Sequence, residues 1–511
     1  MYTGLWGEVR GVKMTNYVDL SGKPFHFIGI GGIGMSALAY ILAKRRLPVS
    51  GSDIRESHIT EKLAALGTHI FSCQDASNLE FFRSQTDASF QALAVSGNNA
   101  PVFVKSSRRA SQAIANSKIA ELPQVICSTA IHAGNLEYQA ALDLGCPIFH
   151  RSDLLAALIQ ERYSIAVAGT HGKTTTSSAI GYMLLKAGLD PTIIVGGEVK
   201  AWEGNARLGN SQYLVAEADE SDGSLVKLAC QIGVVTNIEL DHPDHYKSLE
   251  QVVKTFQTFA QQCQQVVGCI DCPTVRDRLQ PTISYSLNPE LAADYTVSNV
   301  IYGADGTIAT VWERGKELGQ LRLPLLGQHN LSNALAAIAV GRLLGVEFAA
   351  IADSLTTFEG ARRRFELRGV VNDIQFIDDY AHHPSELQAT LAAAKLQAKP
   401  QTRVVAIFQP HRYSRTLTFL SDFAKSFSHA DAVVLTDIYS AGEPNSGQID
   451  GERLAALVAT HHPQVTYLPT LAAVEEFLVE NLRSGDTALF LGAGNLNQII
   501  PNAIEKIKAN G

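Results

Sequence analysis

The chain reads Gly169-Thr170-His171-Gly172-Lys173-Thr174-Thr175-Thr176 directly after the apolar run Tyr163–Ala168, and a helix-compatible segment, 177–189, follows. Strand, glycine turn and helix in this order are the setting of a phosphate-binding loop. The glycines let backbone N–H groups surround phosphate oxygens, Lys173 can reach the outer phosphates, and the Thr174 hydroxyl can bind magnesium. We therefore predict an ATP site made of Gly169, Thr170, His171, Gly172, Lys173, Thr174 and Thr175.

The spacing of this loop is unusual. A generic G-x-x-x-x-G-K loop would need glycine at position 167, which is valine here, and the glycine that precedes Gly172 is Gly169. The shortened loop favours a particular lineage of ATPases over a generic one.

A second glycine turn lies near the N-terminus. The apolar run Phe25–Ile28 leads into Gly29-Ile30-Gly31-Gly32-Ile33-Gly34 and a helical pattern, and Asp53 follows a second strand, 47–50. This is the complete dinucleotide fingerprint, in which a diphosphate lies on a helix N-terminus and an acidic residue holds a ribose hydroxyl. NAD and a UDP-sugar both fit that description, so the turn alone leaves the two ligands open.

Length and composition limit the function classes. A chain of 511 residues is long enough for about three domains. The formal net charge of -8 and the lack of a basic run argue against nucleic acid or an anionic membrane as the main partner. No apolar stretch reaches the ~18 residues of a membrane span and no signal-peptide pattern is present, so we expect a cytoplasmic protein without membrane insertion. The seven cysteines are scattered, and Cys269-Ile270-Asp271-Cys272 lacks the second pair of a zinc site.

Strands and helical segments alternate along most of the chain, which predicts an α/β fold with three domains, 1–160, 161–360 and 361–511. In the central domain, Glu217 follows a strand at 213–216 and Asp241-His242 follow a strand at 232–236. Such strand ends are where open α/β sheets place ligands. The C-terminal strand candidates are 374–377, 404–408, 432–435, 465–468 and 488–491. Residues 73–124 show little periodicity beyond a candidate strand at 92–95.

Three clusters accompany the phosphate loop: Glu217 with His242, residues 327–334 (Gly-Gln-His-Asn-Leu-Ser-Asn-Ala) and residues 360–365 (Gly-Ala-Arg-Arg-Arg-Phe). Their order and spacing, over nearly the whole chain, resemble the Mur ligase family, the ATP-dependent enzymes that add amino acids to the cytoplasmic peptidoglycan precursor. The resemblance implies a Rossmann-like N-terminal domain for a UDP-substrate, a P-loop ATPase-like central domain, and a Rossmann-like C-terminal domain for the amino acid.

Two C-terminal motifs are more specific. Residues 377–384 read Ile-Asp-Asp-Tyr-Ala-His-His-Pro, and residues 409–416 read Gln-Pro-His-Arg-Tyr-Ser-Arg-Thr. They resemble the branch of the family that joins L-alanine to the lactyl carboxylate of UDP-N-acetylmuramate through an acyl phosphate. This implies ATP and Mg2+ as cofactors and UDP-N-acetylmuramate, L-alanine and ATP as partners. We expect a monomer or weak homodimer.

The resemblance also implies roles for single residues. The expected catalytic residues are Lys173, Glu217, His242 and His382, and the expected magnesium ligands are Thr174, Glu217 and His242. Asn330 resembles the residue that reads adenine, Arg364 the one that binds the γ-phosphate, and Asp379 the one that binds the ATP ribose. The residues expected around the alanine are Tyr380, His382, His411, Arg412 and Arg415. Those expected to bind the UDP-substrate are Gly29, Gly31, Gly32, Gly34, Asp53 and Ser128.

Elementary chemistry fits these roles. A carboxylate and a triphosphate are both anions, so their meeting requires cations, which Lys173 and two magnesium ions would supply. Arg412 and Arg415 lie three residues apart, on one face if the segment is helical, and two guanidinium groups can grip a free α-carboxylate. The alanine amine must lose a proton, for which His382 or the departing phosphate could serve.

Three other functions stay open. A ligase that attaches a whole murein tripeptide to UDP-N-acetylmuramate shares much of the pattern. An NAD-dependent oxidoreductase fits the N-terminal turn but leaves Lys173 and the paired arginines without a role. A non-catalytic nucleotide-binding regulator would bind ATP without releasing phosphate.

Three positions depart from the patterns of the family. Ala381 stands where glycine is more frequent, and Asn495 where aspartate is frequent. Sibling ligases carry a carbamylated lysine on the helix after the Asp-His motif, and Phe256 stands at that position here. We therefore expect no carbamate, with Lys254 as a solvated lysine.

Overall fold

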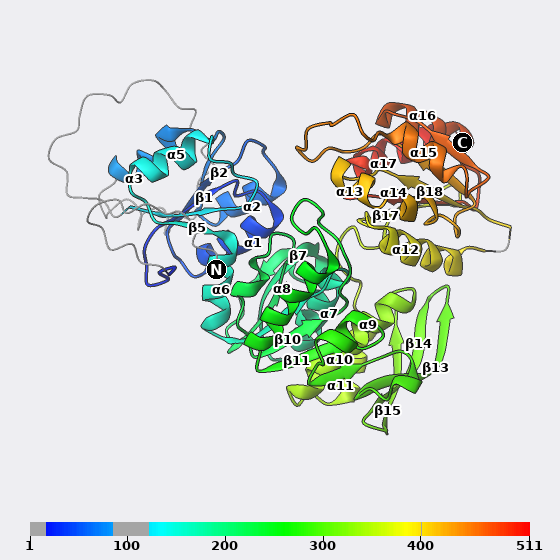
Figure 1. The fold of residues 1–511 in the computed structure, drawn as a ribbon, viewed down its shortest axis with the longest axis horizontal. Helices are drawn as coiled ribbons and strands as arrows, with labels where there is room; N and C mark the ends of the chain where they lie inside the picture. Colours follow the sequence, from blue (N-terminus) through cyan, green and yellow to red (C-terminus); the bar gives the residue numbers. More distant parts are fainter. Residues whose placement is uncertain (1–16, 85–121, 400, 511) are drawn as a thin grey trace. The chain divides into compact units, whose positions relative to one another are not determined.

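The computed structural model describes residues 17–84, 122–399 and 401–510, and the expected strand at 92–95 lies outside them (Figure 1). The chain forms two compact units, Met1–Glu161 and Arg162–Gly511. The first contains one sheet and the second contains two, each accompanied by helices. The α/β fold class is therefore confirmed, and the boundary at 360/361 stays a prediction.

The first unit is an all-parallel sheet of order β3-β2-β1-β4-β5. Its strands are β1 (Phe25–Ile28), β2 (Val49–Ser52), β3 (His69–Phe71), β4 (Gln124–Cys127) and β5 (Ile148–His150). Its α-helices include α1 (Ile33–Lys44), α2 (His58–Ala65), α3 (Phe81–Ser84), α5 (Leu136–Asp143) and α6 (Arg151–Gln160). The strand order reverses between β1 and β4, and ligands of open α/β sheets bind outside such a switch point. The predicted second strand, 47–50, begins two residues too early, because Val49 rather than Leu47 pairs with Phe25.

The central sheet has the order β15-β14-β13-β12-β11-β10-β6-β9-β7-β8. Its strands are β6 (Tyr163–Ala168), β7 (Thr192–Val199), β8 (Gly204–Arg207), β9 (Tyr213–Glu217), β10 (Ile232–Val235), β11 (Gln265–Cys269), β12 (Ile283–Tyr285), β13 (Tyr295–Gly303), β14 (Gly306–Glu313) and β15 (Lys316–Leu323). Its α-helices are α7 (Lys173–Lys186), α8 (Leu249–Gln262), α9 (Pro273–Arg278), α10 (Gln328–Leu343) and α11 (Phe348–Thr356). Because β6 lies between β10 and β9, the phosphate loop is flanked by the ends of both neighbours.

Strands β13 to β15 form an antiparallel extension that simple strand and helix alternation did not predict. Buried and half-exposed side chains alternate along β14, as expected where one face of a sheet packs on a core. Ala304-Asp305 and Arg314-Gly315 form the two tight turns, with positive φ at Arg314 and Gly315 and at Gly306, which begins β14.

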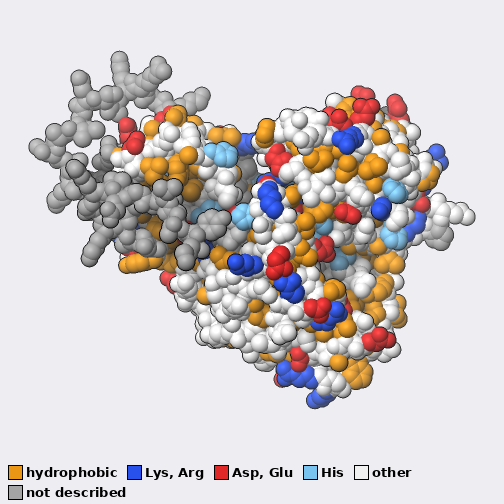
Figure 2. Space-filling view, viewed as in Figure 1, with side chains coloured by type: hydrophobic (Ala, Val, Ile, Leu, Met, Phe, Trp, Pro, Cys, Tyr) orange, Lys and Arg blue, Asp and Glu red, His pale blue; other side chains and the backbone are white. Residues whose placement is uncertain are grey.

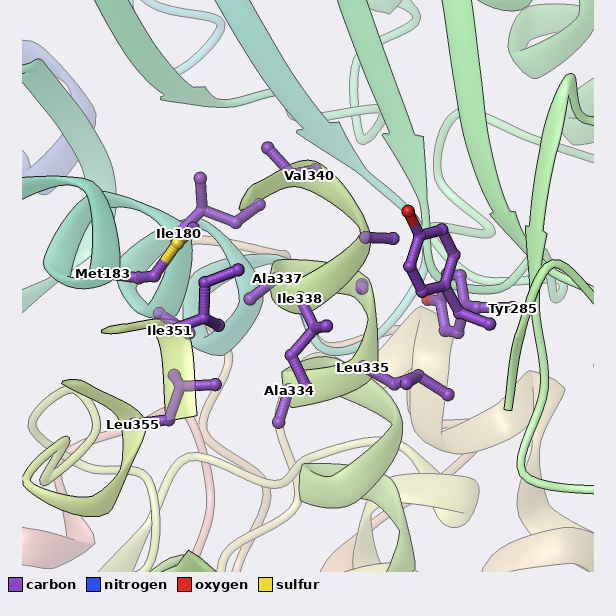
Figure 3. Packing of buried hydrophobic residues seen from close by; sticks show 14 of the residues in the cluster. Ile180, Met183, Tyr285, Ala334, Leu335, Ala337, Ile338, Val340, Ile351 and Leu355 are labelled. Carbon is purple, nitrogen blue, oxygen red and sulfur yellow. The ribbon is translucent and has the colours of Figure 1, made fainter. Parts of the chain in front are cut away.

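Helix α10 lies at the centre of a large core in the central domain. Eleven of its sixteen residues are buried, and Figure 3 shows Ile180 and Met183 of α7 and Ile351 and Leu355 of α11 on one side of α10, with Tyr285 on the other. A Cβ on Gly341 would lie 2.7 Å from Met183 Sδ, so glycine lets the two helices approach closely. This packing fixes the N-terminal turn of α10 beside the phosphate loop.

The third sheet has the order β16-β17-β21-β18-β19-β20, with only β16 antiparallel. Its strands are β16 (Glu366–Val371), β17 (Ile374–Asp379), β18 (Val404–Phe408), β19 (Ala432–Leu435), β20 (Val465–Tyr467) and β21 (Thr487–Leu491). Its α-helices are α12 (Pro384–Gln397), α13 (Tyr413–Thr418), α14 (Leu420–Ala424), α15 (Gly451–Val458), α16 (Leu471–Asn481) and α17 (Ile500–Asn510). The five predicted strands are all present, and the ends of β17 and β18 carry the two specific motifs.

Candidate active site

The phosphate loop is held by the residues that follow β10. Thr170 N donates to Asn237 O at 3.0 Å, and His171 N donates to Asn237 Oδ1 at 2.8 Å. Gly169 and Gly172 have φ of 141° and 81°, and a Cβ on either would overlap Thr236 or Asn333. The loop conformation thus requires glycine at both positions.

Lys173 points back over its own loop. Its Nζ donates to Gly169 O at 2.6 Å, to Thr170 O at 3.1 Å and to Glu220 Oε1 at 2.9 Å. Burial raises the pKa of Glu220 to about 7, although the charge of Lys173 acts in the opposite direction. Burial lowers the pKa of Lys173, but Glu220, Asp219 and Glu217 outweigh it and raise that pKa. Lys173 is therefore an ammonium ion at neutral pH.

The three expected magnesium ligands surround this ion pair. Glu217 ends β9, and its Oε2 accepts a hydrogen bond from Gly196 N at 2.7 Å. Thr174 lies beside the next residue of that segment, because a Cβ on Gly197 would be 3.1 Å from Thr174 Cγ2. His242 has φ of 53°, and its Nε2 lies 3.8 Å from Glu220 Oε1. Burial lowers the pKa of His242, which keeps the imidazole neutral and able to bind a metal.

A cavity of about 360 Å³ opens beside the loop, within the size range of small-ligand sites. Six of the ten expected ATP residues line it: His171, Gly172, Thr175, Asn330, Arg364 and Asp379. The other four, Gly169, Thr170, Lys173 and Thr174, belong to the loop and to the start of α7. Burial raises the pKa of Asp379 to about 6, and its two oxygens accept from Phe365 N and Ala381 N. Asp379 thus also holds the backbone directly after Arg364 and directly after Tyr380.

His171 joins the loop to α12. Its Nδ1 lies 3.2 Å from Glu386 Oε1, and its Nε2 lies 3.5 Å from Glu239 Oε2. Burial lowers the pKa of His171, but the two carboxylates overcome this and raise it to about 10. His171, Glu239 and His383 are close enough to hold a metal ion, yet a protonated His171 would repel a cation.

The residues expected around the alanine form a chain of contacts. The rings of Tyr380 and His382 are 5.4 Å apart, those of His382 and His411 are 5.9 Å apart, and Arg415 Nη1 donates to His411 Nδ1 at 3.2 Å. Tyr439 stacks on His411. Burial lowers the pKa of His382 to about 4, so both its ring and that of His411 are neutral at pH 7.

The two arginines are bound to central-domain acids. Arg415 Nε donates to Asp241 Oδ1 at 2.9 Å with both side chains buried, whereas Arg412 Nη1 donates to Asp244 Oδ2 at 2.7 Å with both partly exposed. A shared helical face was expected if the segment is helical, and this condition is not met at Arg412, which precedes α13 with φ of 69°. Arg412 N instead donates to Tyr439 O at 2.8 Å, which holds this turn.

In the first unit, the N-terminal glycine turn follows β1 at the switch point, and Ser128 follows β4. Gly31 N donates to Asp53 Oδ2 at 2.8 Å, so the acidic residue of the fingerprint also fixes the turn. Arg151 Nη1 would lie 3.2 Å from a Cβ on Gly34. The expected set Gly29, Gly31, Gly32, Gly34, Asp53 and Ser128 thus lies around the ends of three neighbouring strands, β2, β1 and β4, with a guanidinium beside it.

Several residues of the site were given no individual role from the sequence: Glu220, Asn333, Asp241, Glu239 and Glu386. Asn333 Oδ1 accepts from Thr176 Oγ1 at 3.1 Å and lines the cavity. It lies about one helical turn after Asn330, so the spacing Asn-x-x-Asn could have predicted that both side chains lie on the same face of the helix. Asp241 was expected only as part of a strand end where ligands bind. The other three acids carried no such signal, because a single acidic residue in a loop or in the first turn of a helix is usually solvated.

A phosphate loop, a sheet that supplies acids and an imidazole beside it, and a third sheet that closes a cavity of small-ligand size are the features of a nucleotide-binding α/β enzyme. Three family models match consecutive parts of the chain: the Mur ligase family catalytic domain at 24–163, the Mur ligase middle domain at 167–341, and the Mur ligase glutamate ligase domain at 363–494. The chain belongs to the Mur ligase family, whose members are ATP-dependent amide-bond-forming ligases.

Curated relatives are similar over nearly the whole length. The UDP-N-acetylmuramate–L-alanine ligase of Nostoc punctiforme is 70% identical over 491 residues, covering 96% of this chain and 98% of the relative. That of Synechococcus elongatus is 60% identical over 500 residues, covering 96% and 98%.

Solved structures agree with the fold. The UDP-N-acetylmuramate–alanine ligase of Thermotoga maritima matches with a TM-score of 0.76 at 26% identity, covering 96% of this chain and all of that one. A murein peptide ligase of Psychrobacter arcticus matches with a TM-score of 0.66 at 22% identity, covering 95% and 99%, and this likeness supports the fold alone.

None of the helices among residues 17–84, 122–399 and 401–510 has the length and apolar character needed to cross a bilayer. On the face in Figure 2, positive and negative side chains are interspersed over the second unit.

Proposed function

We propose that this chain joins L-alanine to the lactyl carboxylate of UDP-N-acetylmuramate, with ATP converted to ADP and phosphate. The observation that supports it most is the chain of contacts from the phosphate loop to the alanine-specific motifs, through His171 to Glu386 and through Asp241 to Arg415. Relatives with this activity in their names match at 60–70% identity.

In the first step a lactyl carboxylate oxygen attacks the γ-phosphorus and ADP leaves, which gives an acyl phosphate. Lys173 supplies positive charge beside the phosphates, where two anions would otherwise repel each other. The donors Thr174, Glu217 and His242 fit a hard cation, because two are oxygens and the third is a neutral imidazole. When bound there, magnesium would neutralise phosphate charge.

In the second step the alanine nitrogen attacks the acyl carbon and phosphate leaves. Nδ1 of His382 donates to Tyr380 O at 2.9 Å, so the neutral ring keeps its lone pair on Nε2. This nitrogen can accept a hydrogen bond from the amine and orient it. With a pKa of about 4 it is a weak base, so the departing phosphate is the better final acceptor of the proton.

The two arginines have different roles in this proposal. The Arg412–Asp244 pair is partly exposed, so the α-carboxylate of alanine can displace Asp244 and take its place on the guanidinium. The Arg415–Asp241 pair is buried, and separating it would leave two uncompensated charges. Arg412 therefore binds the substrate, and Arg415 positions His411 and the segment that carries His242.

The decisive experiment supplies the full-length protein with Mg-ATP, UDP-N-acetylmuramate and either L-alanine or the tripeptide L-alanyl-γ-D-glutamyl-diaminopimelate. Phosphate release and product mass are measured in each case. We expect a product with alanine and only background with the tripeptide. A tripeptide product would assign the chain to cell-wall recycling, and ATP binding without phosphate release under either condition would make it a regulator.

A further inference from the structure

Two cysteines of the central domain lie side by side at the end of the sheet where β10 and β11 begin. Cys230 precedes β10 by two residues, and Cys263 precedes β11 by two residues. The strands are parallel neighbours with Ile232 opposite Gln265. The same register, extended by two residues, places Cys230 opposite Cys263, and Gln264 N donates to Cys230 O at 3.1 Å.

Their sulfur atoms are in direct contact, with Cys230 Sγ 3.3 Å from Cys263 Sγ. Neighbouring strands are ~4.8 Å apart, within the Cα separation of about 4.4–6.8 Å that a disulfide spans. A bond between the sulfurs therefore requires side-chain rotation and little backbone movement. Glycine at position 233 leaves room for the Cys263 side chain, because a Cβ there would lie 2.5 Å from the Cys263 sulfur.

The two thiols differ in access. Cys230 is 3% exposed, whereas Cys263, at the end of α8, is partly exposed. The hydrogen bond with Cys263 and burial raise the pKa of Cys230 well above its usual value. Cys263 is consequently the thiol that an oxidant meets first, with Cys230 behind it as the resolving thiol.

We propose that Cys230 and Cys263 are a redox-active pair that is oxidised to a disulfide by thiol–disulfide exchange with a small or protein disulfide. The Cys263 thiolate attacks one sulfur of the oxidant, whose S–S bond breaks and releases a thiolate. Cys230 then attacks the Cys263 sulfur and releases the second thiolate. The oxidant takes up two electrons and the two cysteine protons and becomes two thiols, while one S–S bond forms in the protein.

The bond closes a loop of 33 positions that contains α8 and the segment with Asp241 and His242. Because a cross-link of this span restricts the unfolded chain, it stabilises the central domain. The pair lies at the opposite end of β10 from His242, so this effect is on stability rather than on the reacting groups.

The test uses the full-length protein after incubation with oxidised glutathione and removal of the reagent. We expect titratable thiols in denaturant to fall from seven to five, and the Tm to rise by about 5 °C or more, both reversed by dithiothreitol. Mass spectrometry of the digest should show the peptide with Cys230 joined to the peptide with Cys263.

Cys263→Ser and Cys230→Ser should each abolish the rise in Tm, and either variant suffices if the other fails to fold. Cys272→Ser is the matched control, since it removes another partly exposed thiol, and it should keep the rise. Seven thiols after oxidation, an equal Tm rise in Cys263→Ser, or a cross-link to Cys269 or Cys272 would each overturn the proposal.

Discussion

Arg415 and Asp241 form a buried, two-point ion pair: Nε donates to Oδ1 at 2.9 Å, and Nη2 donates to Oδ2 at 3.3 Å. Burial raises the pKa of Asp241, but the charge of Arg415 outweighs it and holds that pKa far below its usual range. Asp241 directly precedes His242, and Arg415 contacts His411. One ion pair thus connects an expected magnesium ligand to the expected alanine site.

Removing one member of this pair should destabilise the protein strongly. Asp241→Ala leaves the Arg415 charge buried and unpaired, which costs about 3–5 kcal/mol, and the double variant with Arg415→Ala should lose less than the sum of the single losses. Urea unfolding of the four proteins measures the coupling. The Arg412–Asp244 pair is the matched control, for which exposed geometry predicts about 0–1 kcal/mol. Equal coupling in both pairs would contradict the distinction.

Arg412→Ala should raise the KM for alanine at least tenfold with a smaller effect on kcat, because its charge acts on a bound carboxylate. Asp244→Asn removes the competing carboxylate and should lower that KM or leave it unchanged. Initial rates against alanine concentration at saturating ATP and UDP-N-acetylmuramate measure both. Unchanged alanine saturation in Arg412→Ala would place the amino acid elsewhere.

Lys173→Ala should reduce phosphate release to background while the fold persists, since Lys173 meets charge that develops during phosphoryl transfer. Removing a buried ammonium also leaves Glu220 unpaired, so the control is Lys173→Ala with Glu220→Gln, which restores neutrality but not the cation. Circular dichroism verifies the fold of both. Activity regained by the double variant would show that Lys173 serves only to neutralise Glu220.

The continuous apolar strands were predictable because a buried parallel strand has no polar face. Val404–Phe408 is an example, fully buried and placed at the correct residues. The partners of the charged residues were not predictable. Glu220 follows Glu217 by three residues in an acidic segment that resembles a solvated loop, and only the fold places it against Lys173. Likewise, Asp241 and Arg415 are 174 positions apart in the sequence, so their pairing could not be predicted from it.

The ion network around His171 should give a pH-dependent stability. Its pKa is raised to about 10 from 6.5, so its contribution is complete below pH 6.5 and is lost as the pH rises through 10. For Glu239, burial raises the pKa, but the protonated His171, whose Nε2 lies 3.5 Å from Glu239 Oε2, lowers it to about 2, so its contribution is complete above pH 4.5 and is lost as the pH falls through 2. The stability difference between wild type and His171→Asn should therefore shrink between pH 6.5 and 10. His461→Asn, at an exposed histidine, is the control, and a constant difference for His171→Asn would contradict the network.

Activity should not require carbon dioxide. The resemblance to the family puts Phe256 where sibling ligases are expected to carry a carbamylated lysine. It is fully buried in α8, and an aromatic ring can neither take up CO2 nor bind a hard cation. Lys254, the nearby lysine on the same helix, is exposed to solvent. Rates in buffers freed of bicarbonate should equal those with bicarbonate added, and Lys254→Ala should stay within about twofold of wild type. The matched control is Lys247→Ala, an exposed lysine just before α8. Loss of activity in Lys254→Ala alone, restored by formate or high chloride, would show that a carbamate forms there.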